Sequence, residues 1–272
     1  MNKQGSKDNP RGGIEWTHVF GDGTGYTWNP VSGCEHDCQW TMPDGQIAGC
    51  YAKAVAEKLR SDKFFPHGFE QITFHPERLK EPGKKKDPSG IFLDSMSDLM
   101  GANVLVEYIV KVLDIVRSNP QHVFQLLTKN APRLLKFKDL FPSNLWVGVS
   151  TPPDFMFGKP LSRQQQEAML RTTLGVLASL DSPVRWLSAE PLSWDISPVL
   201  SDYPGAINWI VVGAASDGPR YFPPNETDLV NVLAETARQN IPIFFKGNMK
   251  SAPLIQSGQI HWLDAMPKGT HP

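Results

Sequence analysis

The sequence contains few cysteines, almost no net charge and no long hydrophobic run. Three cysteines in 272 residues are too few, and odd in number, for the disulfide framework of a secreted domain. Lys and Arg total 27 against 28 Asp and Glu, a net charge of −1, so no overall field draws the chain to nucleic acid or an anionic membrane. No apolar run approaches the roughly 18 residues of a membrane-spanning helix, and the polar N-terminus is not a secretory signal. We therefore expect a cytoplasmic protein that does not bind membranes.

Short apolar runs alternate with helical patterns from about residue 70 onward. The runs are rich in β-branched and aromatic residues, as in strands buried on both faces of a parallel sheet. They are 72–75, 90–94, 123–127, 145–149, 184–188, 209–213 and 242–245. The helical patterns between them are 103–118, 131–140, 162–180 and 226–240.

With an extended segment at 26–29, the pattern gives about eight strands. The hydrophobic content of 40% is enough for one large core. We predict an α/β fold, a single (β/α) barrel of the TIM type with about eight parallel strands, and an open doubly wound sheet is the alternative. The expected boundaries are a flexible tail at 1–13, the barrel at 14–250 and a C-terminal tail at 251–272.

All three cysteines, Cys34, Cys38 and Cys50, fall in one short loop at 34–50. Three thiolates this close in sequence can hold three irons of a [4Fe–4S] cluster and leave the fourth iron open. S-adenosylmethionine (SAM) binds an open iron through its amino and carboxylate groups in radical chemistry. Two alternatives remain: a zinc site completed by His36 or His67, and three ordinary cysteines in a loop.

Polar residues follow several of the predicted strands. The carboxyl ends of parallel strands share one face, so these side chains should meet there beside the cysteines. We predict six of them as cofactor-binding residues: Ser95, Ser97, Lys129, Ser150, Glu190 and Lys246. Glu190 and Ser150 are the best candidates for SAM, because a carboxylate and a hydroxyl can bond ribose hydroxyls or the amino group. An ion pair with a lysine is the alternative for Glu190, and a helix cap is the alternative for Ser97 and its neighbours.

Six motifs along the chain resemble a known family. They are WNPVSGC at 28–34, CYA at 50–52, FLDSMSDL at 92–99, FQLLTK at 124–129, WVGVS at 146–150 and SAEPL at 188–192. In this order they resemble the successive blocks of a phage- and mobile-element-associated radical-SAM-like family of unknown function, over most of residues 14–250. The resemblance implies a barrel of the radical-SAM type, a [4Fe–4S] cluster on the three cysteines, and SAM as cofactor.

The chain departs from that family in three places. The gap between the second and third cysteines, 39–49, is eleven residues and contains the turn signal Pro-Asp-Gly at 43–45, so it should loop out and leave these cysteines close together. Gly-Ala-Ala at 213–215 stands where the family usually has Gly-Gly-Glu, and Lys-Gly-Asn at 246–248 replaces a Lys-Gln-Trp-like block.

These observations predict a radical SAM enzyme that cleaves SAM and abstracts hydrogen from an unidentified substrate. The implied phage association suggests a nucleotide or nucleic acid as substrate, and an electron donor would be a second partner. The alternative is a zinc-stabilised nucleic-acid-binding or adaptor protein without redox chemistry.

Overall fold

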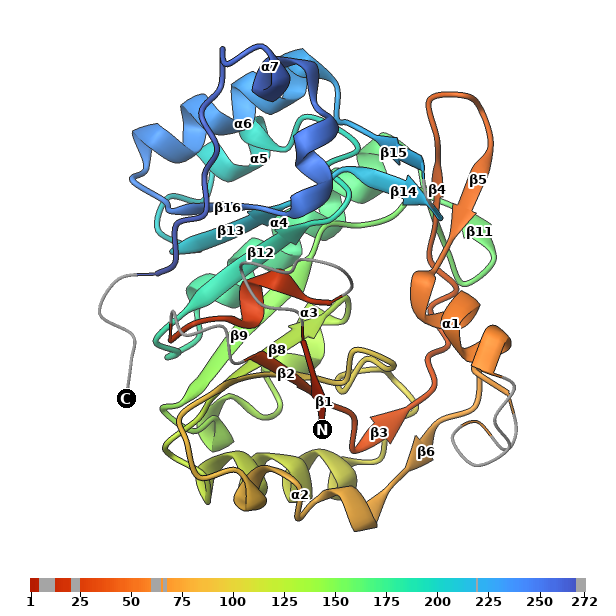
Figure 1. The fold of residues 1–272 in the computed structure, drawn as a ribbon, viewed down its shortest axis with the longest axis vertical. Coiled ribbons are helices and arrows are strands. Elements are labelled where there is room, and N and C mark those ends of the chain that lie inside the picture. Colours follow the sequence, from red (N-terminus) through yellow and green to blue (C-terminus); the bar gives the residue numbers. More distant parts are fainter. Residues whose placement is uncertain (5–12, 21–24, 60–64, 66–67, 219, 268–272) are drawn as a thin grey trace.

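An eight-stranded, mostly parallel sheet organises the chain in the computed structural model (Figure 1). The structure describes residues 1–4, 13–20, 25–59, 65, 68–218 and 220–267. In spatial order the strands are β1 (Asn2–Lys3), β2 (Gly25–Trp28), β7 (Gly90–Leu93), β8 (Val123–Thr128), β9 (Leu145–Ser150), β12 (Arg185–Ala189), β13 (Trp209–Val212) and β16 (Ile243–Phe245). β1 runs antiparallel to β2, and each of the other neighbouring pairs is parallel.

The α/β prediction is confirmed, whereas a closed barrel is not found. β1 and β16 are the two ends of the strand order, and no pairing within the described residues joins them. The run at 72–75 was predicted to belong to the main sheet, but β6 (Thr73–Phe74) pairs antiparallel with β3 (Val31–Ser32) in a ladder of its own. The eighth place in the sheet is instead taken by β1, from the segment expected to be a tail.

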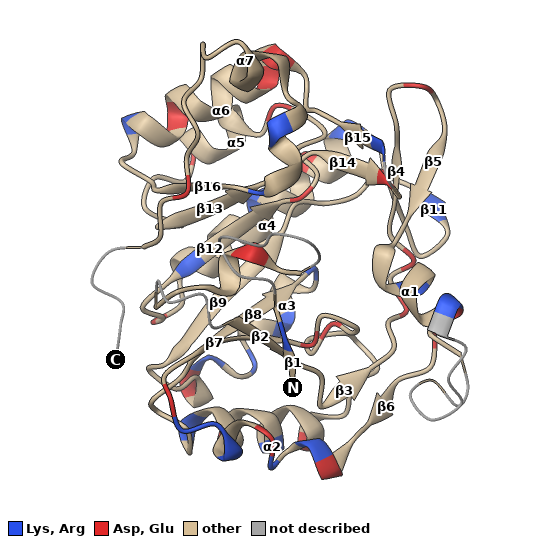
Figure 2. Cartoon of the chain, in the orientation of Figure 1, with Lys and Arg blue, Asp and Glu red and all other residues tan. Residues whose placement is uncertain are grey.

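Helices cover one face of the sheet (Figure 1). They are α2 (Val106–Arg117), α3 (Ala131–Leu134), α4 (Arg163–Ala178), α5 (Ser197–Ser201) and α6 (Glu226–Arg238). The side chain of Ser162 caps α4 and that of Asn225 caps α6, which satisfies backbone N–H groups that have no partner within the helix. Charges of both signs lie on α2 and α6 (Figure 2), in keeping with the balanced composition.

Strand alternation separates two hydrophobic layers. Ile91 and Leu93 of β7 pack in the large core under the helices, whereas Phe92 between them belongs to a second cluster on the opposite face. That inner cluster is built around Trp16 of a 3-10 helix, η1 (Glu15–Thr17), whose ring centroid lies 4.8 Å from that of Trp186. Several residues of this cluster lie at the start of their strands, such as Val123 in β8 and Trp209 in β13. The 3-10 helix η1 therefore covers the amino-terminal half of the sheet's inner face.

The remaining elements are shorter, and two hairpins among them lie beside the carboxyl ends of the strands (Figure 1). The hairpins β4 (Gln39–Thr41)–β5 (Ile47–Gly49) and β10 (Phe155–Met156)–β11 (Lys159–Pro160) form one four-stranded sheet. The other elements are α1 (Tyr51–Leu59), β14 (Ala215–Asp217), β15 (Arg220–Phe222), α7 (Pro253–Gln256) and the 3-10 helices η2 (Pro76–Arg78), η3 (Pro82–Lys84), η4 (Lys138–Leu140) and η5 (Gly247–Ser251).

The segment after residue 250, expected to be a C-terminal tail, returns to the sheet as far as it is described. The indole N–H of Trp209 donates to the carbonyl of Ala265 at 2.9 Å, and Asp264 forms an isolated antiparallel bridge with Phe244. Within the described part of the chain, no helix has the length and apolar character needed to cross a membrane.

Candidate metal and cofactor site

A cavity of about 1020 Å³ lies at the carboxyl ends of the central strands. The structure brings all nine predicted site residues to its wall: Cys34, Cys38, Cys50, Ser95, Ser97, Lys129, Ser150, Glu190 and Lys246. They come from six separate parts of the chain, so their meeting follows from the shared direction of the strands.

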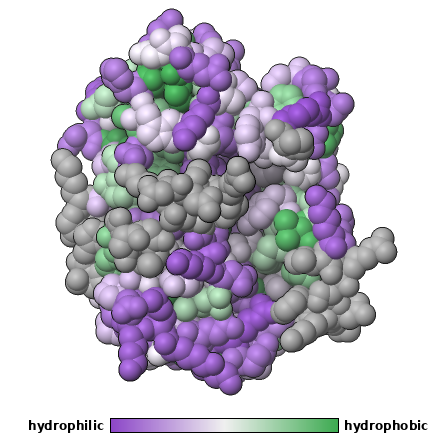
Figure 3. Space-filling model, viewed as in Figure 1, coloured by the Kyte–Doolittle hydropathy of each residue, from purple (hydrophilic) through white to green (hydrophobic). Residues whose placement is uncertain are grey.

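Hydrophobic surface is exposed beside α1 (Figure 3), where α1 carries the exposed Val55 and the adjacent β5 carries the exposed Ile47.

The spacer between the second and third cysteines forms the β4–β5 hairpin. Gln39 pairs with Gly49 at its base, and Cys38 and Cys50 are the next residues outward. Gly45 has a φ of +79° and its N–H donates to the carbonyl of Met42 at 2.8 Å, so the predicted turn closes the hairpin. The predicted looping out of 39–49 is confirmed.

The first cysteine is held by a glycine that cannot carry a side chain. Gly33 has a φ of +91°, and a Cβ there would lie 2.2 Å from the carbonyl oxygen of Gln71. Its N–H donates to the carbonyl of Met96 at 2.9 Å, and that of Cys34 donates to the carbonyl of Phe69 at 2.8 Å. The cysteine loop is thereby fixed to the segment that follows β7.

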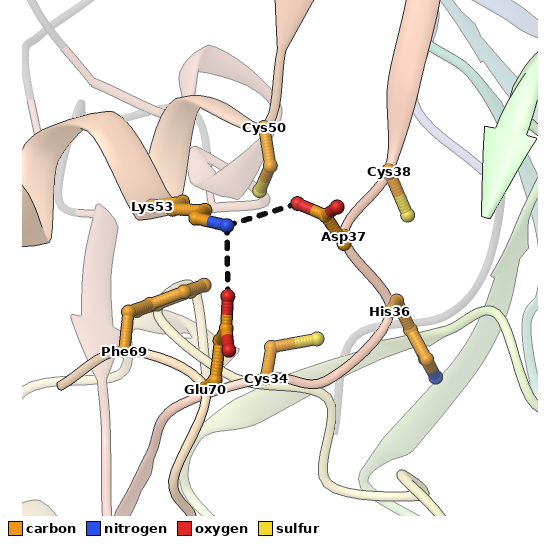
Figure 4. A pocket seen from close by; sticks show the side chains of 8 residues that line it. All are labelled: Cys34, His36, Asp37, Cys38, Cys50, Lys53, Phe69 and Glu70. Carbon is orange, nitrogen blue, oxygen red and sulfur yellow. Dashed lines mark hydrogen bonds and ion pairs between the residues drawn. The ribbon is translucent and has the colours of Figure 1, made fainter. Parts of the chain in front are cut away.

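The three thiol side chains surround one small pocket (Figure 4). Lys53 of α1 closes one side of it, with its ammonium group 3.1 Å from Asp37 and 2.9 Å from Glu70. The pocket shares its three cysteines with the large cavity. A group bound by these thiols would therefore face the cavity.

Cys34 and Cys38 favour their protonated thiol forms in the metal-free chain. Burial raises the pKa of Cys34 to about 12, with a further contribution from the charge of Asp98, and burial raises the pKa of Cys38 to about 11. Burial alone would lower the pKa of Lys129, but the nearby Cys38 and Cys50 raise it. A cationic metal group would displace the thiol protons and offset the cost of burying thiolates.

A single metal ion and a four-iron cluster place different demands on the side chains around the pocket. Within the described residues, no three His, Cys, Asp or Glu side chains converge as one metal ion requires. Zinc needs four donors about 2.0–2.3 Å from one centre, whereas thiolates on a four-iron cluster bind different irons and stand farther apart. His36 turns its Nδ1 toward Asp98, 3.5 Å away, and His67 lies outside the described residues.

The segment after β7 combines satisfied and unsatisfied polar groups. The hydroxyl of Ser95 donates to Asn29 at 3.1 Å, and the buried Asp94 accepts the N–H of Val31 at 3.0 Å. Burial raises the pKa of Asp94 well above its ordinary value. The other oxygen of Asp94 and the hydroxyl of Ser97 have no hydrogen-bond partner in the described part of the chain. These two atoms fit a polar ligand in the cavity.

Glu190 forms an ion pair with a lysine, which is the alternative role that the sequence offered for it. The ammonium group of Lys246 lies 3.1 Å from one carboxylate oxygen, and the hydroxyl of Ser188 donates to the other at 3.1 Å. The charge of Glu190 raises the pKa of Lys246. Gly213 leaves room for this pair, because a Cβ there would lie 3.1 Å from the Cγ of Glu190. The pair still lines the cavity, so its oxygens and nitrogen border any ligand bound there.

The sequence analysis missed one aromatic residue of the cavity wall and an acidic residue beside it. Trp40 of β4 lies under the ammonium group of Lys129, which is 5.8 Å from the centroid of the indole ring. Tyr51, expected near the cysteines because it follows Cys50, lines the same cavity, and its hydroxyl donates to the carbonyl of Ser95 at 2.8 Å. Glu15 accepts the N–H of Gly247 at 2.7 Å. Their positions depend on the hairpin and on η1, whose places in the fold no local sequence pattern gives.

Comparisons with known proteins support the family and the fold. The family described as "Protein of unknown function (DUF5131)" matches residues 11–258, so the chain belongs to that family. No curated protein sequence matches the chain. A solved variant of spore photoproduct lyase has a TM-score of 0.50 at 9% identity, over 79% of this chain and 74% of that one. The structure of the lyase complexed with dinucleoside spore photoproduct has a TM-score of 0.48 at 10% identity, over 79% of this chain and 74% of that one. The first of these likenesses, at 0.50, supports the α/β fold alone.

Proposed function

We propose that this chain is a radical SAM enzyme in which Cys34, Cys38 and Cys50 hold a [4Fe–4S] cluster. The observation that carries the proposal is the meeting of all three cysteines of the sequence around one pocket that borders a large cavity lined by both polar and apolar side chains. Three thiolates leave one iron for SAM. When bound and reduced, the cluster would supply the electron that cleaves SAM and so begins hydrogen abstraction.

The residues of the cavity have distinct parts in this proposal. Lys129 lies in the wall beside the cysteines and offsets their negative charge. The unbonded hydroxyl of Ser97 is available to a polar group of SAM. Glu190 and Ser150, at the ends of β12 and β9, can accept hydrogen bonds from ribose hydroxyls or an amino group. Ser95 and Lys246 complete the proposed cofactor-binding set.

The size of the cavity favours a small substrate. Pockets for small molecules and cofactors usually measure about 300–1,000 Å³, so about 1020 Å³ must accommodate both SAM and the molecule that loses hydrogen. A nucleotide satisfies this limit, and a nucleic acid satisfies it if one nucleotide is extruded into the cavity. An external electron donor is also part of the proposal.

Anaerobic purification tests this function directly. We expect brown protein with broad absorbance near roughly 400 nm, about four irons and four sulfides per chain, and formation of 5′-deoxyadenosine when SAM and dithionite are added. Colourless protein that retains zinc would support the zinc alternative instead. Protein with an intact cluster that leaves SAM uncleaved would contradict the proposed reaction.

A further inference from the structure

Asp98 joins two strand ends of the candidate site. It follows β7, is 6% exposed, and is absent from the cofactor-binding set predicted from the sequence. One carboxylate oxygen accepts the N–H of Met100 at 2.9 Å. The other accepts both the hydroxyl of Thr128, at 3.0 Å, and the N–H of Lys129, at 2.8 Å. This single carboxylate therefore connects the segment after β7 with the end of β8.

The same carboxylate faces the cysteine loop through His36. The Nδ1 of His36 lies 3.5 Å from the oxygen that Thr128 and Lys129 also contact. His36 is 3% exposed and stands between Cys34 and Cys38 in the sequence. Its ring packs perpendicular to that of Phe157, with the two ring centroids 5.3 Å apart. The backbone N–H of Phe157 donates to the carbonyl of His36 at 2.7 Å. His36 is thus held by Asp98 on one side and by Phe157 on the other.

A backbone contact strengthens this connection. Gly33 and Ser97 form an isolated parallel bridge. Gly33 directly precedes Cys34, and Ser97 directly precedes Asp98. The backbone of the cysteine loop and the carboxylate segment therefore lie side by side. The charge of Asp98 acts on this region too, because it contributes to the raised pKa values of Cys34 and Lys129.

We propose that Asp98 is a positioning residue that holds the cysteine loop against the ends of β7 and β8 and places a negative charge beside the proposed cluster. The inference rests on the proposed function for its effect on the cluster, but not for its effect on the loop. Residues behind metal ligands orient those ligands, and their loss typically costs about 10- to 100-fold in metal affinity. Nearby charge also sets the reduction potential of an iron–sulfur cluster.

Three variants of the full-length chain test the proposal. Asp98→Asn keeps the shape of the side chain and removes its charge. His36→Gln removes the ring nitrogen that faces Asp98 and leaves the carboxylate in place. Glu35→Gln is the matched control, because Glu35 is an acidic residue of the same loop whose described side-chain contacts are with Asn103 at the surface. Each variant is compared with the parent for iron retention against a chelator, for reduction potential, and for thiol alkylation in the metal-free protein.

We expect Asp98→Asn to bind iron about 10- to 100-fold more weakly, to shift the reduction potential upward, and to alkylate faster without metal. His36→Gln should alkylate faster with little change in potential, and Glu35→Gln should match the parent. Parent-like alkylation in both Asp98→Asn and His36→Gln would overturn the positioning role, even if one of them folds poorly. An unchanged potential in Asp98→Asn would overturn the charge effect. If the parent binds no iron, the proposed function fails, and the alkylation rates still decide the positioning role.

Discussion

Gln39 and Gly49 pair with each other at the base of the β4–β5 hairpin. Gln39 directly follows Cys38, and Gly49 directly precedes Cys50. Residues directly opposite in an antiparallel ladder have Cα atoms about 4.5–5.5 Å apart. The eleven-residue spacer therefore adds almost no distance between Cys38 and Cys50. A long gap in sequence is compatible with a shared cluster because the additional residues form their own ladder and project away from the pocket.

Shortening this hairpin should leave iron binding intact. Replacement of residues 41–47 by Asn-Gly, a sequence that favours two-residue hairpin turns, retains the base pair of Gln39 and Gly49. We expect iron and sulfide contents equal to those of the parent after anaerobic reconstitution. Substitution of the whole segment 39–49 by a flexible Gly-Ser chain of equal length is the control and should lower both. Iron loss in the short version would show that the hairpin does more than bring the cysteines together.

Each cysteine should be indispensable for the cluster. Cys34→Ala, Cys38→Ala and Cys50→Ala each remove one of three thiolates, and the sequence has no fourth to replace it. We expect each variant to lose the absorbance near roughly 400 nm and its iron and sulfide. Full iron and sulfide in any one of them would remove that cysteine from the site.

Glu190→Gln separates a ligand role from an ion-pair role. The substitution keeps the shape of the side chain and removes the charge that faces Lys246. If Glu190 contacts SAM, we expect weaker SAM binding by calorimetry with unchanged iron content. Lys246→Met is the companion variant, because it breaks the same ion pair and leaves Glu190 in place. Equal losses of thermal stability in the two variants, with parent-like SAM binding in Glu190→Gln, would make Glu190 structural.

Gly148→Ala should destabilise the inner face of the sheet. A Cβ at Gly148 would lie 2.1 Å from the ring of Trp186, and overpacking of this kind typically costs about 1–3 kcal/mol. Gly175→Ala is the matched control, because it lies within α4 and its nearest neighbour would be the ring of Tyr203 at 3.7 Å. We expect that change to stabilise by about 0.5–1 kcal/mol. Urea titration measures both, and equal midpoints would contradict the packing argument.

The sequence predicted the strands and long helices well, because their periods are local. It was wrong about 72–75, since a short β-branched run does not reveal its pairing partner and this one pairs with β3. Nor did the sequence indicate that β1 joins the main sheet, because a two-residue strand does not reveal that it pairs with β2. The meeting of Glu190 and Lys246 with the cysteines was predictable from the common direction of parallel strands. The part played by Asp98 was not, because it depends on which groups from other segments lie within hydrogen-bond distance.

His122 should make the protein acid-sensitive. It is fully buried, its Nε2 lies 3.1 Å from the carbonyl oxygen of Lys85, and burial lowers its pKa. Since the unfolded chain takes up a proton near pH 6.5 and the folded chain resists it, stability is present above that pH and falls as the pH decreases. One such histidine contributes at most about 1.4 kcal/mol per pH unit.

We expect the free energy of unfolding to fall between pH 7.5 and 5.5 in the parent, and to fall less in His122→Gln, whose amide can still donate to a carbonyl. His261, in an exposed position, provides the control variant His261→Gln, which should follow the parent. Urea titrations at the two pH values measure the difference. Parallel losses in the parent and His122→Gln would assign the acid sensitivity to other buried groups.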